Sequence, residues 1–356
     1  MATIALFGLD IGKHSFHLVG QDANGKPVFK RQFTRSSLIH YLAQHPACRI
    51  VMEACCGAHW LARQLAGFGH QVQLIAPQYV RPFVTGNKND FLDAHAICEA
   101  ASRPSMRYVG VKTPEQQASS ALHRLRETRI ADRVQTANQI HALLLEFGIV
   151  LPLGARGIKQ VPDIVMNASA DLPHAARRIL SAQYEHYRYL AELIAGLDSQ
   201  IGAQAKADAL TSRLMTIPGI GPITASQLAA DAGNAQSYGS ARHFAASLGL
   251  VPRQHSTGGK SKLLGISKRG DKSLRRLLVQ CARVVMQNAA KWQSAVAQWT
   301  QQLMTRRHSN VVACALANKL ARIVWVVLVK GEEYRPIPQC CLKVSNTSPS
   351  FPGDMK

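Results

Sequence analysis

The most constraining feature of the sequence is the order of short apolar runs and amphipathic segments in its first 80 residues. Residues 4–9, IALFGL, are typical of a β-strand, and the segments flanking Asn24-Gly25 are typical of a β-hairpin because that dipeptide favours a tight turn. A helix is expected from Ser36, then a strand in CRIVMEA, a helix in AHWLARQLAGFG and a strand in HQVQLIAP. This order predicts a mixed α/β sheet with crossover helices.

A long helical region is expected after this sheet. Thr113, Pro114 and Gln116 have the pattern of a helix N-terminus, with a capping hydroxyl, proline at the first helical position and glutamine at the third. The Pro- and Gly-containing stretch 151–162 ends this helix, and a second helix begins near Asp171. Two long helices joined by a loop predict an antiparallel hairpin or a dimerising coiled coil. Ordinary helices packed on one domain are the alternative.

The C-terminal third is expected to be mostly α-helical. Its segment LMTIPGIGPITASQLAADAG has the form of a helix-hairpin-helix, in which Gly219 and Gly221 let backbone N–H groups approach a phosphate. A tight glycine turn without a ligand is the alternative. Helical pattern continues to about Lys330, and the Pro- and Ser-rich tail beyond it is expected to be disordered. We therefore predict a metal-binding α/β domain at 1–110, a helical coiled-coil region at 111–205, a C-terminal domain at 206–331 and a disordered tail at 332–356.

The charge of the chain indicates a polyanionic partner. Its 356 residues include 42 Lys and Arg against 21 Asp and Glu, for a formal charge of +21. Between Ala232 and Gly331 there are 16 basic residues and a single acid, Asp271. Nucleic acid is the partner that such a basic block favours, and a membrane surface is the weaker alternative.

Neither a membrane span nor an exported, disulfide-bonded protein is expected. No run approaches 18 apolar residues, and the N-terminus has no basic region ahead of its apolar stretch. The eight cysteines include two adjacent pairs and no C-x-x-C, so neither a disulfide framework nor a structural zinc site is indicated. We expect a cytoplasmic protein associated with the nucleoid.

Four acids stand where a metal-dependent phosphoryl-transfer site requires them. Asp10 ends the first strand, Glu53 lies in a later strand, and Asp90 and Asp93 are one helical turn apart in NKNDFLDAHA. Taken singly, each acid is more often a solvated residue or a helix cap. Asp10 and Glu53 interrupt or end apolar strands, where an unpaired charge is costly. Because Mg²⁺ prefers oxygen ligands and paired ions stabilise the attacking and leaving oxygens, the four acids predict a site like that of RNase H and RuvC.

A second candidate site is the basic loop RQHSTGGKSK at residues 253–262. Ser256 and Thr257 stand before two glycines, and a serine that attacks phosphorus requires nearby cations and a flexible backbone. A basic Ser/Gly loop that only contacts phosphate is the alternative, and His255 is expected to be such a contact. The residues expected to bind the nucleic-acid backbone are Gly219, Gly221, Arg253, His255, Thr257, Lys260, Lys262, Lys268, Arg269, Lys272, Arg275 and Arg276.

These motifs together resemble the DEDD insertion-sequence transposases of the IS-one-ten family, over about residues 4 to 330. The carriers are GLDIGK, VMEAC, KNDFLDA, IPGIGP, GLVPRQHSTGGK and GISKRGDKSLRRLL. Within this family, the sequence RQHSTGGK is more similar to that of the IS-eleven-eleven subgroup. The resemblance implies a RuvC-like N-terminal domain of RNase H fold, a coiled-coil middle and a C-terminal transposase domain. By resemblance the family's acids fall on Asp10, Glu53, Asp90 and Asp93.

The resemblance also implies a mechanism and partners. The family's catalytic serine precedes a glycine, which by spacing falls on Thr257, but Ser256 is the favoured nucleophile because its alcohol is primary and less hindered. The implied enzyme is an RNA-guided recombinase that uses a covalent phosphoserine link, double-stranded donor and target DNA, an element-encoded guide RNA, and two Mg²⁺ ions with Mn²⁺ as a substitute. Dimers are expected to pair into tetramers. The alternatives are a RuvC-like endonuclease using metal-activated water, and a non-enzymatic nucleic-acid-binding scaffold.

Overall fold

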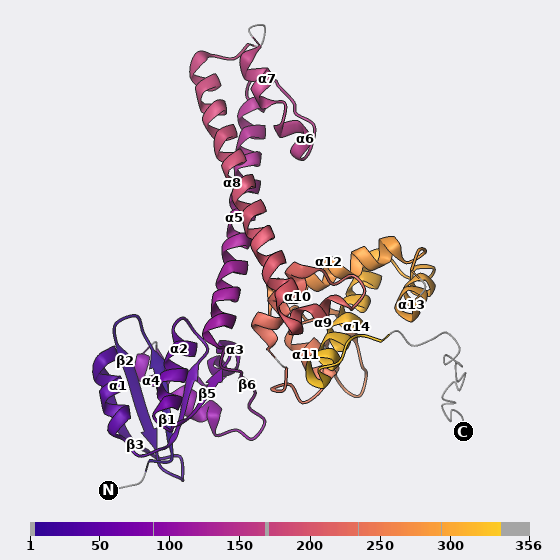
Figure 1. The fold of residues 1–356 in the computed structure, drawn as a ribbon. Helices are drawn as coiled ribbons and strands as arrows, with labels where there is room; N and C mark the ends of the chain where they lie inside the picture. The colour runs from indigo at the N-terminus through magenta and orange to yellow at the C-terminus, as the bar shows by residue number, and fades with distance from the viewer. Residues whose placement is uncertain (1–3, 88, 168–170, 234, 293, 336–356) are drawn as a thin grey trace, which may run out of the picture. The chain divides into compact units, whose positions relative to one another are not determined.

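The computed structural model describes residues 4–87, 89–167, 171–233, 235–292 and 294–335 and divides the chain into two compact units. The first comprises Met1–Leu125 with Ala230–Gly233, and the second comprises Arg126–Ala229 with Asn234–Lys356 (Figure 1). Residues 230–233 belong to the first unit because Lys112 forms an ion pair with Asp231, and the Ser120 hydroxyl donates to the same carboxylate at 2.9 Å. The three-part division expected from the sequence stays a prediction.

A six-stranded sheet forms the centre of the first unit. The strands are β1 (Leu6–Ile11), β2 (Phe16–Gln21), β3 (Pro27–Phe33), β4 (Arg49–Glu53), β5 (Gln71–Ile75) and β6 (Tyr108–Val109). Their order is β3-β2-β1-β4-β5-β6, with β4 parallel to both β1 and β5 and the other neighbours antiparallel. The predicted mixed sheet is confirmed, and the sheet with its helices is consistent with an RNase H-like domain.

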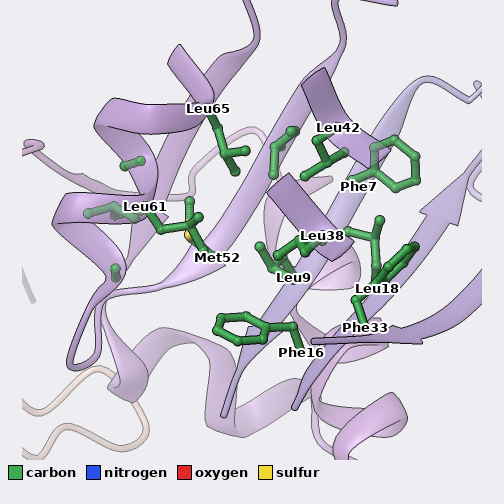
Figure 2. Packing of buried hydrophobic residues seen from close by; sticks show 14 residues of the cluster. Phe7, Leu9, Phe16, Leu18, Phe33, Leu38, Leu42, Met52, Leu61 and Leu65 are labelled. Atoms are coloured by element: carbon green, nitrogen blue, oxygen red, sulfur yellow. The ribbon is translucent and has the colours of Figure 1, made fainter. Parts of the chain in front are cut away.

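Two helices cover one face of this sheet. Alternate residues of a strand point to the same side, so the apolar side chains on this face form one surface on which the helices pack. Helices α1 (Arg35–Gln44) and α2 (Ala58–Gly67) pack there on Phe7 and Leu9 of β1 and their neighbours. Figure 2 shows these rings and aliphatic side chains interlocked between sheet and helices. This core holds β1 and β4 rigidly, and so fixes the backbone from which Asp10 and Glu53 project.

The opposite face carries the intervening residues of the same strands and is covered by α4 (Asp90–Ala101). Gly8 of β1 allows this helix to come close, since a Cβ atom at Gly8 would stand 2.4 Å from the Ala94 carbonyl oxygen and 2.5 Å from Cys98 Sγ. The chain between β5 and α4 forms the short helices α3 (Pro77–Val80) and η1 (Arg81–Phe83). Glycine at position 8 thus sets the distance between β1 and the acidic helix.

Replacing Gly8 with Ala is expected to lower the free energy of unfolding by about 2–4 kcal/mol, because α4 has to move away from β1 to admit the methyl group. Urea denaturation measures this change. The matched control is Gly196→Ala at an exposed position in a helix interior, where a Cβ atom meets nothing within 4 Å and alanine is expected to stabilise by up to about 1 kcal/mol. Equal stability of the two variants would show that α4 is not held against Gly8.

Two long helices form an antiparallel pair. These are α5 (Pro114–Leu145), which begins in the first unit and continues in the second, and α8 (His174–Ala207), with the short helices α6 (Ala155–Ile158) and α7 (Val161–Met166) in the connection. Thr113 and Gln116 form the predicted cap, each accepting a hydrogen bond from the other's backbone N–H, at 3.2 and 3.0 Å. Arg126 pairs with Asp198, and the distal ends share an apolar cluster. The helical hairpin is confirmed, whereas a dimerising coiled coil stays a prediction.

The remainder of the second unit is mostly helical, as expected. It contains α9 (Ala209–Met215), α10 (Pro222–Ala232, which ends in the first unit), α11 (Ala241–Ser247), α12 (Lys272–Asn288), α13 (Ala295–Met304) and α14 (Ser309–Lys330), with a β-hairpin of β7 (Pro252–Gln254) and β8 (Leu263–Ile266). Helix α14 is long and apolar enough to span a bilayer by composition, but half of its apolar window is buried against the rest of the protein. That burial is typical of a core helix. The six cysteines of the described residues are all free.

Candidate active site

Two of the predicted acids lie on the sheet face that α4 covers. Leu6 and Gly8 of β1 face α4, so the alternation of side chains along the strand places Asp10 on the same side of the sheet. In β4, Val51 faces α4, so Glu53, two residues further on, also points to that side. Strands β1 and β4 are parallel neighbours paired Leu6–Arg49 through Leu9–Met52, and one more step of this register brings Asp10 level with Glu53. The two carboxylates therefore leave the same end of adjacent strands.

The other two acids lie in the first turn of α4. Asn89 caps this helix, and its side-chain oxygen accepts a hydrogen bond from the Phe91 backbone N–H at 3.0 Å. Asp90 and Asp93 follow, one helical turn apart, at an end of the helix that favours negative charge. The structure thus brings the start of α4 to the strand ends that carry Asp10 and Glu53.

The carboxylate of Asp10 is influenced by the other three acids. Burial raises the pKa of Asp10 to about 6, and the charges of Asp93, Asp90 and Glu53 add to the increase, whereas His17 opposes it. The pKa of Glu53 is raised by burial and by Asp93, and Arg81 lowers it. Carboxylates whose pKa values are raised by burial and by neighbouring acids, as for Asp10 and Glu53, are unfavourable for the fold and typical of a functional site.

The donors of this cluster fit a hard divalent cation. Carboxylate oxygens are the ligands that Mg²⁺ and Mn²⁺ prefer, and a cation among the four acids would remove their mutual repulsion. Within the part of the chain that the structure describes, no three His, Cys, Asp or Glu side chains are already arranged as ligands of one ion. A bound ion therefore has to draw the side chains toward itself.

His17 belongs to this cluster, although nothing in the sequence analysis pointed to it. It lies directly opposite Asp10 in the β1–β2 ladder, and its Nδ1 is 4.0 Å from Asp10 Oδ2 and 3.7 Å from Asp90 Oδ2. The register of the β1–β2 hairpin is the signal that could have identified it. If β1 ends near Asp10 and GKHS forms a short turn, then His17, the polar residue that interrupts the apolar run FHLV, lies across from Asp10.

The predicted nucleophile lies in the second unit, at the tip of the β7–β8 hairpin. Pro252 pairs with Ile266 and Gln254 with Leu263, so the chain from 255 to 262 forms the connection between the strands. Ser256 is exposed, and its Oγ accepts a hydrogen bond from Gln254 Nε2 at 2.8 Å. The loop RQHSTGGKSK is therefore a two-stranded hairpin rather than an irregular turn, a feature that the sequence analysis did not predict.

The neighbouring hydroxyl, Thr257, is also exposed but is part of the turn itself. Its carbonyl accepts a hydrogen bond from the Lys260 backbone N–H at 3.0 Å, which closes the turn over Gly258 and Gly259. Both glycines have positive φ, +54° and +75°, and open space around them, so the turn geometry alone favours glycine. The choice between Ser256 and Thr257 stays a prediction.

Comparison with known proteins places this arrangement in a family. A family model described as "Transposase" with the DEDD motif in its name matches residues 7–149, and one described as "Transposase IS116/IS110/IS902 family" matches residues 211–298. The transposase for insertion sequence element IS1328 of Yersinia enterocolitica is 52% identical over 331 residues, which cover 93% of this chain and 98% of that relative. The chain belongs to this family of insertion-sequence transposases.

Two further relatives agree. A probable family 20 transposase of Pseudomonas aeruginosa is 45% identical over 94% of this chain and 99% of its own length. The transposase for insertion sequence element IS1111A of Coxiella burnetii is 39% identical over 94% of this chain and 92% of its own length, in agreement with the predicted subgroup. The predicted family and enzyme class, DNA cleavage and rejoining, are confirmed, and a DEDD domain implies that the transposase uses a divalent metal.

The basic residues of the transposase fall into two groups. Of the eight Lys and Arg residues predicted to contact the nucleic-acid backbone, six have neither an ion pair nor a side-chain hydrogen bond to another described residue: Arg253, Lys260, Lys262, Lys268, Arg269 and Lys272. Arg275 instead donates to the Leu248 carbonyl at 2.9 Å, and Arg276 pairs with Glu127 at 2.8 Å. The first group is available to phosphates, whereas Arg275 and Arg276 already have partners within the fold.

Replacing Lys262 with Ala is expected to weaken DNA binding and to reduce the slope of log K against log salt by about 0.9, because one phosphate contact is lost. Its melting temperature and its sequence preference should not change, since the side chain is exposed. The matched variant is Arg275→Ala, which is expected to lower the melting temperature by a few degrees because the Leu248 carbonyl loses its donor. Fluorescence anisotropy at several salt concentrations and thermal unfolding measure both. A changed target preference in Lys262→Ala would contradict a backbone contact.

The two glycines of the α9–α10 turn differ. Gly219 has φ +83°, and a Cβ atom there would stand 2.6 Å from Val285 Cγ2 and 2.8 Å from the Cys281 carbonyl oxygen of α12. Glycine is thus required at 219 for packing inside the protein. Gly221 is exposed and has open space around it. Phosphate contacts at either glycine, and at His255, stay predictions.

Proposed function

We propose that this transposase is an RNA-guided recombinase, which cuts and rejoins DNA through a covalent phosphoserine link at Ser256 and a divalent-ion centre held by Asp10, Glu53, Asp90 and Asp93. The observation that carries the proposal is that α4 brings Asp90 and Asp93 to the strand ends that bear Asp10 and Glu53. Burial raises the pKa of Asp10 to about 6, and the three other acids add to the increase. Such crowding is costly without a cation, and it persists only where a function requires it.

The acids would hold Mg²⁺, with Mn²⁺ as a substitute. When bound, the ions supply positive charge and Lewis-acid polarisation at the scissile phosphate. Asp10 and Glu53 are fixed by rigid strands, so they would define the position of the phosphate. Asp90 and Asp93 stand on a helix that Gly8 holds close to β1, so they would complete the ligand set from the other side.

Ser256 would take over the DNA strand. Its Oγ forms a bond to phosphorus, the bond from phosphorus to the leaving strand oxygen breaks, the serine proton is lost, and the leaving oxygen gains a proton. Gln254 Nε2 donates to Oγ, which orients the hydroxyl while leaving its own proton free to depart. Arg253, Lys260 and Lys262 surround the tip with positive charge that stabilises the developing anion. Attack by the incoming strand's hydroxyl reverses the step and releases Ser256.

Nucleic-acid partners are supported by the charge of the C-terminal half, where one acid stands among 16 basic residues between Ala232 and Gly331. We assign to this surface the donor and target DNA and the element-encoded guide RNA, whose base pairing would supply the sequence specificity. The expected contacts are to phosphates and therefore carry no sequence preference of their own.

Assembly into dimers and then tetramers is part of the same proposal. The paired helices α5 and α8 expose large apolar side chains, with 51% of Val134, 61% of Leu145 and 52% of Ile179 accessible to solvent. Apolar positions on solvent-facing helices favour a helical partner. A dimer or tetramer would let the acids of one subunit serve Ser256 of another.

The test is to incubate the purified transposase with the element-encoded RNA, labelled donor DNA and Mg²⁺, and to separate the products on a denaturing gel. A protein–DNA adduct that requires the RNA and Mg²⁺ supports the proposal. Cleavage without an adduct would instead favour the RuvC-like endonuclease, and binding without cleavage would favour the scaffold. Cleavage that is independent of the RNA would remove the guide from the proposal.

A further inference from the structure

His17 is the most unusual side chain near the four acids. Only 6% of its surface is exposed, although polar side chains such as histidine are seldom buried so completely. The Phe91 ring packs against it in a T-shaped arrangement with 4.7 Å between ring centroids, and Lys30 Nζ lies 4.3 Å from the centre of the Phe91 ring. The imidazole is therefore held in place on its apolar side and points its Nδ1 toward Asp10 and Asp90.

The Nδ1 atom has no hydrogen-bond partner among the described residues, although it is buried. Its separations from Asp10 and Asp90, 4.0 and 3.7 Å, are too long for a hydrogen bond. A buried polar atom without a partner costs about 1–3 kcal/mol. Arg129 Nε and Arg213 Nε are also buried without a partner in the described part of the chain, but His17 Nδ1 lies within 4.0 Å of two acids of the predicted site, which indicates that a partner belongs between His17 and these carboxylates.

The separations themselves indicate what kind of partner fits. Ligands bound at about 2.1–2.2 Å to one octahedral ion lie about 3 Å apart when adjacent and slightly over 4 Å apart when opposite. The two His17–carboxylate separations, 4.0 and 3.7 Å, lie between these two values, so a bound ion would bring the three side chains together by small movements of their donor atoms. A water molecule would satisfy Nδ1 as well, but it would leave the repulsion among the acids in place.

We propose that His17 Nδ1 is a ligand of one of the divalent ions and shares that ion with Asp10 and Asp90, so that one ion site has mixed nitrogen and oxygen donors. This inference rests on the proposed function of the four acids. Nδ1 offers its lone pair, which places the imidazole proton on Nε2. Imidazole binds transition metals better than Mg²⁺ or Ca²⁺, so this site favours Mn²⁺ over Mg²⁺ more strongly than carboxylates alone do.

The test uses Mn²⁺ alone as the probe on the full-length protein. Electron spin-echo spectroscopy of the bound Mn²⁺ detects a directly coordinated nitrogen, and we expect this signal in the wild type, with the change that ¹⁵N-labelled histidine produces. His17→Asn, whose amide oxygen replaces Nδ1, is expected to lose the signal and to bind Mn²⁺ about tenfold more weakly or worse, with a smaller change for Mg²⁺. The matched control is His14→Asn, an exposed histidine in the β1–β2 connection three residues before His17, which should keep the wild-type signal and affinity.

Three outcomes would overturn the proposal: a wild-type spectrum without coordinated nitrogen, a signal that survives in His17→Asn, or an equal loss of affinity for Mn²⁺ and Mg²⁺. If His17→Asn fails to fold, the wild-type spectrum with labelled histidine still decides. Asp10→Asn separates this inference from the proposed function. Mn²⁺ binding that depends on Asp10 but shows no nitrogen removes only the role of His17, whereas Mn²⁺ binding that does not depend on Asp10 removes both.

Discussion

Replacing Asp10 with Asn is expected to abolish DNA cutting and, at the same time, to raise the melting temperature of the metal-free protein. Cutting should fall by at least about 10³-fold, because loss of one carboxylate from the ion centre removes several kcal/mol of stabilisation of the transition state. Binding of RNA should be largely unchanged, since the basic residues expected to contact it lie in the other unit. Gel assays of cleavage and of RNA binding measure the two effects separately.

The gain in stability follows from the sign of the pKa change. The folded protein raises the pKa of Asp10 from 3.8 to about 6, so the folded state binds this proton more readily than the unfolded state. The contribution of Asp10 is therefore favourable below the unfolded pKa and is lost as the pH rises through about 6. At neutral pH the penalty is on the order of 1–3 kcal/mol once solvent screening of this partly exposed carboxylate is allowed for, and asparagine removes most of it. A rise of several degrees is expected by calorimetry at pH 7.

Two controls make this experiment decisive. Asp171→Asn, the same substitution at an exposed aspartate, is expected to change neither the melting temperature nor cleavage. Adding Mg²⁺ should raise the melting temperature of the wild type, because the ion binds its folded form and not its unfolded form. The melting temperature of Asp10→Asn should not change with Mg²⁺, because this variant lacks a ligand of the ion. A lower melting temperature in Asp10→Asn would mean that the carboxylate has a stabilising partner in the fold, which would contradict a crowded acidic centre.

Much of the first unit was predictable because its signals are local. The Asn24-Gly25 turn, where Gly25 has φ +80°, gave the β2–β3 hairpin. The pattern of Thr113 and Gln116 located the start of α5. Strand alternation then placed Asp10 on one face once β1 was known. These inferences need only the chemistry of residues close together in the chain.

Other features were missed because they depend on partners distant in sequence. Strand β6, Tyr108–Val109, is two residues long and exists because it pairs with the end of β5. The β7–β8 hairpin carries few apolar residues, so its sequence has the composition of a loop. Arg276 forms an ion pair with Glu127 of α5, which is 149 positions away along the chain. A helical sequence pattern does not reveal such a distant partner, so Arg276 was predicted to contact nucleic acid together with the unpaired basic residues.

Replacing Ser256 with Ala is expected to remove the covalent protein–DNA adduct and strand rejoining altogether, without a measurable change in melting temperature. The hydroxyl is exposed and its recorded contact is the hydrogen bond that it accepts from Gln254, so its loss should change the free energy of unfolding by less than about 0.5 kcal/mol. Because methyl cannot attack phosphorus, no covalent intermediate can form. Denaturing gels detect the adduct, and mass spectrometry of the linked peptide identifies the residue.

The matched control is Thr257→Ala, one residue further along the same turn. This substitution leaves the backbone hydrogen bond from Lys260 to the Thr257 carbonyl in place, so the turn should keep its shape and its surrounding positive charge. If Ser256 is the nucleophile, Thr257→Ala retains the adduct, with at most a modest loss of DNA affinity. An adduct that persists in Ser256→Ala and disappears in Thr257→Ala would move the attacking oxygen by one residue. Both variants keep the hairpin and its basic side chains, so a difference in adduct formation between them shows only which hydroxyl attacks the phosphorus.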